Sequence, residues 1–305
     1  MSWLNGFIRN QSQSLLENKR HAMLQAMILA LLPYTAWLSV TVVALVTLRK
    51  GWRDGALLLA LAMMAYLALA LYSTTPIMAL LNTLLVFVPT YLAACTLRST
   101  ASWRAVAGVY FLQVTVIVLL LQWLMPEFIV AQFLFLQAAL SEIQGEKALL
   151  ALINNKAGFN QTVIASYLLG LQAVGVVFSA ALSLMLARSI QSKLFYPGEF
   201  KREMLAFRGD RMAFFLMLCV FILANQQNIT AITVLPVLVF YFLLTGLSLS
   251  FNVLAKQRPL SSMLILIASL LVLPFIMLPV YVIFGSLDSL FNLRLYLPSD
   301  AGKTI

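Results

Sequence analysis

Apolar residues along this chain gather into long runs that short polar segments separate. The runs cover residues 22–48, 55–71, 77–97, 105–124, 162–187, 212–224, 229–255 and 260–284. Most hold about 17–25 apolar residues, which is enough for an α-helix to cross the hydrocarbon core of a bilayer. The pattern therefore predicts an all-α membrane protein. We expect a polytopic bundle of seven to eight transmembrane helices with one or two interfacial helices, in a single integral membrane domain over residues 1–305.

Two segments between the runs are amphipathic. In residues 127–161, apolar side chains recur at helical spacing and polar ones occupy much of the opposite face, which favours a helix lying at the interface; a tilted or re-entrant span is the alternative. The second segment, residues 188–211, is the central loop. After the turn at Pro197 and Gly198, one face of a short helix carries Phe200, Met204 and Phe207. That face is either a lipid-headgroup anchor or a docking surface for a cytoplasmic partner.

The basic residues predict which loops face the cytoplasm. Residues 49–53, 98–104, 188–211 and 256–258 are rich in Lys and Arg, whereas residues 73–76, 127–161 and 225–228 hold few or none. The N-terminal tail, residues 1–21, is also basic. It reaches the cytoplasm only if the run 22–48 breaks at Pro33 into two short helices, which we favour over a single crossing. In either case we expect the C-terminal tail on the outside.

Composition narrows the function classes. Hydrophobic residues make up 62% of the chain and charged residues only 10%, against about 25% charged in a typical soluble domain. The net charge of +10 sits at the ends of apolar runs, so it indicates membrane anchoring and no nucleic-acid partner. A single histidine, His21, cannot supply Ser-His-Asp or zinc-protease chemistry, and the two cysteines lie in apolar runs. We expect no enzyme, no metal site and no cofactor.

The spans carry polar groups but no charge at their centres, which argues against a proton relay. Two hypotheses fit the uncharged polar residues: a pocket for a neutral ligand, or hydrogen bonds between helices. The sequence names no ligand-binding residue. A further pattern, small residues at every fourth position from Gly175 to Ala187, predicts close helix packing along that face. The uncharged polar residues within the spans are Asn82, Gln113, Gln122, Gln172 and Asn252.

Several segments together resemble the YybS-like bacterial multi-pass membrane proteins, a family of unknown function. They are Pro33 with residues 45–51 (LVTLRKG), residues 197–203 and 205–208 (PGEFKRE and LAFR), and residues 285–294 (GSLDSLFNLR). The chain departs from the family pattern at Leu290, where an aromatic is common, and at Asn292, where an acid is common. The positions that match the family signature are Pro197, Gly198, Phe200, Arg208, Gly285, Asp288 and Arg294.

The resemblance implies a protein of the bacterial cytoplasmic (inner) membrane. Some members are thought similar to the substrate-binding S-components of energy-coupling-factor transporters. Our first hypothesis is therefore a small-molecule transporter or S-component-like subunit, with the lipid bilayer and a separate cytoplasmic ATPase or other membrane subunit as partners. The alternative is a non-transport scaffold that recruits cytoplasmic proteins through its basic central loop. For Asp288 and Arg294, a local ion pair or snorkelling to the interface is a sufficient explanation.

Overall fold

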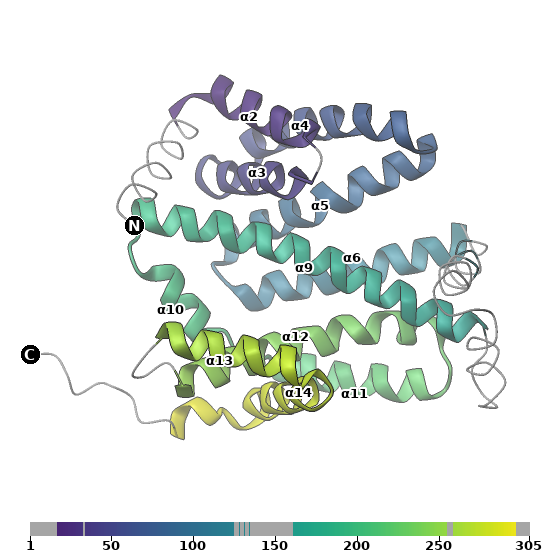
Figure 1. The fold of residues 1–305 in the computed structure, drawn as a ribbon, viewed down its shortest axis with the longest axis vertical. Coiled ribbons are helices and arrows are strands. Elements are labelled where there is room, and N and C mark those ends of the chain that lie inside the picture. Colours follow the sequence, from purple (N-terminus) through teal and green to yellow (C-terminus); the bar gives the residue numbers. More distant parts are fainter. Residues whose placement is uncertain are drawn as a thin grey trace, which may run out of the picture. The chain divides into compact units, whose positions relative to one another are not determined.

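The computed structural model describes residues 17–32, 34–124, 161–254 and 259–296, together with the single positions 128, 131 and 134. In these residues the secondary structure is entirely helical, with eleven α-helices and one 3-10 helix (Figure 1). The helices are α2 (Lys19–Leu31), α3 (Ala36–Lys50), α4 (Trp52–Ser73), α5 (Pro76–Thr100), α6 (Trp103–Leu124), α9 (Gln161–Phe195), α10 (Glu199–Ala206), α11 (Arg211–Asn225), α12 (Ile229–Leu254), α13 (Pro259–Val272), α14 (Pro274–Phe291) and the 3-10 helix η1 (Leu293–Tyr296).

Six of the described helices are long and apolar enough to cross a membrane: α4, α5, α6, α9, α12 and α14. The expected fold class, a polytopic helical membrane protein, is confirmed, with somewhat fewer long spans than the sequence predicts. The chain forms two compact units. Unit 1 comprises Met1–Tyr110 and Gly175–Met204, and unit 2 comprises Phe111–Val174 and Leu205–Ile305. The predicted interfacial helix over residues 127–161 lies almost wholly outside the described residues.

The first apolar run is broken into two short helices, as predicted. Helix α2 ends at Leu31 and α3 begins at Ala36; position 33 itself lies outside the described residues. The Lys19 ammonium meets the Asp54 carboxylate at 2.7 Å, so the start of α2 lies beside the start of α4, which directly follows α3. Both ends of the α2–α3 hairpin therefore lie at the same end of unit 1. At 13 and 15 residues, the helices are about 20–22 Å long, short of the roughly 30 Å hydrocarbon core.

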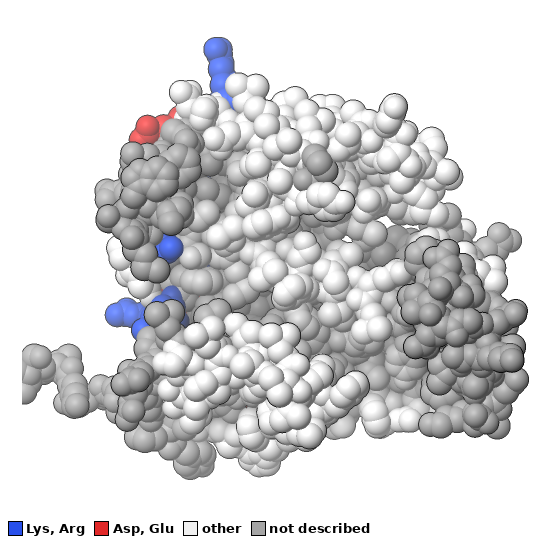
Figure 2. Space-filling model, viewed as in Figure 1, with Lys and Arg blue, Asp and Glu red and all other residues white. Residues whose placement is uncertain are grey.

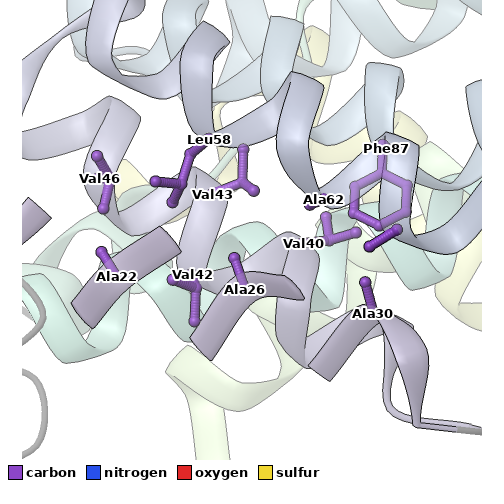
Figure 3. Packing of buried hydrophobic residues seen from close by; sticks show 11 residues of the cluster. Ala22, Ala26, Ala30, Val40, Val42, Val43, Val46, Leu58, Ala62 and Phe87 are labelled. Atoms are coloured by element: carbon purple, nitrogen blue, oxygen red, sulfur yellow. The ribbon is translucent and has the colours of Figure 1, made fainter. Parts of the chain in front are cut away.

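Unit 1 is packed around α3. All its residues from Ser39 to Leu48 are buried, as expected for a helix that is apolar on every side. Alanines at every fourth position of α2 point at the valines of α3, and their small size lets the backbones of α2 and α3 approach closely (Figure 3). Ser39 of α3 donates a hydrogen bond of 2.7 Å to the Ala26 carbonyl of α2. One face of the hairpin is thus packed against protein, whereas Leu32 and Tyr34 beside the break are 48% and 95% exposed.

The basic loops of unit 1 meet at one end. Arg98 at the end of α5 donates to the Thr47 carbonyl of α3 at 3.0 Å, and so satisfies a helix-terminal acceptor. The Arg49 guanidinium lies 4.1 Å from the centre of the Phe195 ring at the end of α9. Together with the Lys19–Asp54 pair, these contacts place the ends of five helices at a single basic end. The charged side chains visible in Figure 2 lie near helix ends, and the helix flanks are white.

In unit 2, the structure corrects the predicted C-terminal topology. The run 260–284 is not one span, because α13 ends at Val272 and α14 begins at Pro274. Ser269 of α13 and Tyr281 of α14 are hydrogen-bonded at 2.7 Å, so the two helices fold back on each other. Arg294, just beyond α14, donates to the Phe207 carbonyl at 2.6 Å. The end of α14 therefore lies beside the start of α11, at the end of unit 2 where the central loop arrives, whereas the sequence pattern predicts these two points on opposite sides of the membrane.

The closest helix contact of unit 2 joins α12 and α14 through two glycines. A Cβ atom on Gly246 would collide with the Tyr281 carbonyl, and one on Gly285 would collide with the Phe242 carbonyl. The small-residue stripe predicted on α9 is only partly correct. Ala187 is buried, but Gly175 is exposed and has open space where a Cβ would stand.

Candidate functional site

The described residues contain no group of three or more His, Cys, Asp or Glu side chains that could hold a metal ion. Two polar clusters and one small closed pocket remain as candidate sites. The first cluster holds the start of the central loop on unit 1, the second holds its end on unit 2, and the pocket lies among the spans of unit 2.

The unit 1 cluster is built on Glu203 of α10. Arg188 of α9 binds this carboxylate with its Nε and Nη2 groups, with Nε lying 3.1 and 3.2 Å from the two oxygens. Trp103 at the start of α6 donates its indole N–H to the same carboxylate at 2.9 Å. Arg188 also donates to the Gln191 side chain at 2.8 Å. These half-buried charge-assisted bonds clamp α10 to α9 and α6.

The turn between α9 and α10 is fixed by Ser192. Its hydroxyl donates to the Tyr196 carbonyl at 2.8 Å and accepts from the Phe200 N–H at 3.1 Å. Pro197 and Gly198 form this turn, and Gly198 has a φ of +89°, which side-chain-bearing residues rarely adopt. Helix α9 extends to Phe195, so the first part of the predicted central loop is helical.

The predicted docking face is turned toward the chain itself. Phe200, Met204 and Phe207 are all half-buried. The Phe200 ring meets Trp103 edge-on at 6.4 Å in unit 1, whereas Phe207 lies beyond the end of α10 and meets Tyr241 at 6.0 Å in unit 2. The helix itself is confirmed as α10. Partner docking through these three residues stays a prediction, and the side chains that α10 exposes include Lys201 and Arg202.

The unit 2 cluster is centred on Arg294. It forms the predicted local ion pair with Asp288, Nε to Oδ2 at 2.9 Å, and Asp288 is fully buried. Its other donors reach the Leu205 and Phe207 carbonyls and the Ser248 hydroxyl. The second carboxylate oxygen of Asp288 is buried and has no hydrogen-bond partner within the chain.

Arg208 completes this cluster from the central loop. Its guanidinium donates to the Asp288 and Ser289 carbonyls at 2.8 and 2.9 Å, which are acceptors in the last turn of α14. Arg208, Asp288 and Arg294 thus converge, and Gly285 lies one turn earlier on α14. The cluster fastens residues 205–208 to the end of α14. Sequence reasoning found the ion pair but not the role of Arg208, because its acceptors are main-chain carbonyls.

The pocket lies between α6, α9 and α12 in unit 2. It is lined by Val118, Leu121, Gln122, Ser166, Leu169 and Thr233. Gln122 accepts a hydrogen bond of 2.8 Å from Thr230, but its side-chain Nε2 is buried without a partner. The Ser166 and Thr233 hydroxyls donate to carbonyls within their own helices, so their oxygens remain able to accept. The walls are closed in this conformation and leave no space for a water molecule.

A second amide of α6 is also unpaired. Both polar atoms of the Gln113 side chain are buried and have no partner in the chain. An unpaired buried amide costs about 1–3 kcal/mol. Sequence reasoning identified Gln113 and Gln122 as polar residues in a span, but could not tell paired from unpaired amides.

Apolar spanning helices, helical hairpins and basic helix ends together define a multi-pass helical membrane protein. Comparisons of the chain with family models, with curated proteins and with solved structures found no match.

Proposed function

We propose that this protein is a transport-type membrane subunit that binds a small, uncharged solute among the spans of unit 2. The observation that carries the proposal is the unpaired amide of Gln122 at a pocket with hydroxyl acceptors on Ser166 and Thr233. The amide supplies donors and the hydroxyl oxygens supply acceptors, without any charge. A neutral solute with hydrogen-bonding groups matches this set. Because the pocket is closed, solute enters only when α6, α9 and α12 separate.

The two hairpins support transport over passive binding. Each unit contains one pair of helices, α2–α3 or α13–α14, that folds back on itself. Interrupted helices of this kind occur in transporters where protein covers the break or where it lines a cavity. Repacking such a hairpin opens a path without exposing main-chain polar groups to lipid.

The proposed partner is a separate cytoplasmic ATPase in a bacterial inner membrane. The motivation is the resemblance of the central and C-terminal segments to YybS-like proteins and, through them, to S-components of energy-coupling-factor transporters. Asp288, a buried carboxylate inside the spanning helix α14, is already paired with Arg294, which favours an energy source on another subunit over a proton relay at this residue.

Copurification tests this function. The full-length protein is purified in mild detergent, and small molecules are extracted and identified by mass spectrometry. We expect a solute enriched with the wild-type protein, lost with Gln122→Leu and retained with Thr115→Val. The control removes a hydroxyl on the same helix that already bonds the Phe111 carbonyl at 2.9 Å. No enriched solute with the wild-type protein, together with no copurifying ATPase, would sink the proposal.

The alternative function, a scaffold for cytoplasmic proteins, is favoured by one observation. Helix α10 is fixed by Glu203 and Trp103 while Lys201 and Arg202 remain exposed, so it displays a rigid basic surface. A photo-crosslinker placed at position 202 in living cells separates the two functions. One abundant protein adduct, together with no solute in the extraction experiment, would favour the scaffold.

A further inference from the structure

A group of exposed cations surrounds the turn between α9 and α10 in unit 1. Lys193 lies in the last turn of α9, and Lys201 and Arg202 lie on α10. We call these three residues the basic corner. Ser192 and the Arg188–Glu203 clamp hold both helices in place, so the three charges are displayed on a rigid support.

The charge of the basic corner is not neutralised within its own helices. Helix α10 has two acidic residues, Glu199 and Glu203, and in the described part of the chain the ion pairs of both go to Arg188. Arg188 is largely buried, with 16% of its side chain exposed, and so presents little charge to the outside. A fourth cation, Arg49 of α3, lies against Phe195 at the end of α9. Glu199, 48% exposed, is the one carboxylate that this part of the described surface displays, and it is itself paired with Arg188, so the three exposed cations outnumber it.

Aromatic side chains place this surface at the boundary of the bilayer. Helix α9 is a spanning helix that ends at Phe195, and Phe195 and Tyr196 are 37% and 49% exposed. Exposed aromatic rings at the end of a spanning helix lie at headgroup level, where Lys and Arg extend to meet phosphates.

We propose that the basic corner binds the phosphate headgroup of an anionic phospholipid in the leaflet that the basic end of unit 1 faces. The headgroup receives Lys193, Lys201 and Arg202, and its glycerol and upper acyl chains lie along Tyr196 and Phe195. The clamp matters because the cations are already in place before the lipid arrives, which lowers the entropy lost on binding. This inference rests on the membrane fold alone and holds whether or not the protein transports a solute.

Lipid retention tests the site. The full-length protein is reconstituted in phosphatidylcholine vesicles with a minority of phosphatidylglycerol, extracted gently, and weighed with its bound lipids by native mass spectrometry. Lys193→Gln, Lys201→Gln and Arg202→Gln are combined in one variant. Each cation near an anionic surface contributes on the order of fivefold in affinity, so the preference for retained phosphatidylglycerol should fall on the order of a hundredfold.

The matched control neutralises three other exposed cations of unit 1, Arg20, Arg53 and Arg104, in the same way. This control has the same net charge as the variant neutralised at the basic corner, and it should keep the wild-type preference for phosphatidylglycerol. A charge-preserving variant, Lys193→Arg with Lys201→Arg and Arg202→Lys, should also keep it and guards against a folding defect.

Three outcomes would overturn the proposal. The wild-type protein could retain both lipids alike. The two neutralised variants could lose phosphatidylglycerol equally, which would indicate diffuse attraction only. Soluble glycerol phosphate could displace the lipid at equal concentration, which would make a free phosphate the true ligand.

Discussion

Replacing Arg294 with glutamine tests whether the unit 2 cluster holds the C-terminal hairpin in place. The guanidinium binds Asp288, the Leu205 and Phe207 carbonyls and the Ser248 hydroxyl. Glutamine is shorter and uncharged, so it reaches few of these acceptors. The Asp288 carboxylate would then be buried with neither oxygen paired, because its other oxygen already has no partner.

The expected loss of stability follows from how deeply the ion pair between Asp288 and Arg294 is buried. Asp288 is fully buried and the Arg294 side chain is 15% exposed, so solvent screens the pair little. Removing one partner of a buried pair costs about 3–5 kcal/mol, and we take the lower end because Arg294 reaches some solvent. For a unit of this size, 1 kcal/mol shifts the midpoint of thermal unfolding by roughly 2–4 °C. We therefore expect Arg294→Gln to lower the midpoint by about 6–12 °C.

The assay is thermal unfolding of purified protein in detergent, followed by the loss of the monodisperse peak in size-exclusion chromatography. Arg211→Gln is the control, because it removes an exposed cation from the start of α11 in the same unit. Asp288→Asn combined with Arg294→Gln removes the stranded charge, and the double variant should recover part of the loss, with a coupling energy of about 0.5–3 kcal/mol. Equal midpoints for Arg294→Gln and Arg211→Gln would refute the reasoning, as would strictly additive effects in the double variant.

Four further outcomes are expected. Gly246→Val should lower the unfolding midpoint, because its side chain collides with the Tyr281 carbonyl, whereas Gly175→Val should leave the midpoint within a few degrees of wild type, since a Cβ there meets open space. Glu203→Gln should speed tryptic cleavage on α10, because it weakens the clamp from Arg188 and Trp103; Glu199→Gln should have a smaller effect, and equal rates would contradict the clamp. Gln113→Leu should raise the midpoint of solute-free protein, because it removes an unpaired amide worth about 1–3 kcal/mol; a lower midpoint would indicate a partner for that amide. Fluorescent reporters fused to the two ends of the chain should both be active in the cytoplasm, and a silent C-terminal fusion would contradict the α13–α14 hairpin.

Local sequence signals predicted the spans, the short helix α10 and the ion pair between Asp288 and Arg294. The length of the hydrophobic runs predicts the spans, and the helical spacing of apolar residues predicts α10. Asp288 and Arg294 are only six positions apart, so their pairing is also a local signal. The sites that hold the fold together were not predictable in the same way. Arg208 acts on main-chain carbonyls 80 residues away, and Gln122 meets Thr230 across 108 positions. Residue type does not reveal such partners, because any main-chain carbonyl is an equivalent acceptor.

Asn292 has a role that its local structure explains. It follows the last residue of α14 and adopts a left-handed conformation with a φ of +51°. Asparagine tolerates this conformation better than most residues, and its N–H donates to the Asp288 carbonyl at 3.1 Å. The cap turns the chain so that Arg294 can return to Asp288. An acid at this position would place a second negative charge near the Asp288 carboxylate and weaken that return.

The C-terminal hairpin was missed although the sequence held the signal that correctly predicted the N-terminal one. The run 22–48 has Lys19 and Arg20 before it and Arg49 and Lys50 after it, so the positive-inside rule requires both of its ends on one side, and Pro33 offers the break. The run 260–284 satisfies the same conditions. Arg258 precedes it, Arg294 follows it, and Pro274 stands near its middle. Hydropathy alone reads both runs as single spans, because neither carries a charged residue inside. Basic residues on both flanks and an internal proline therefore predict a hairpin in each case.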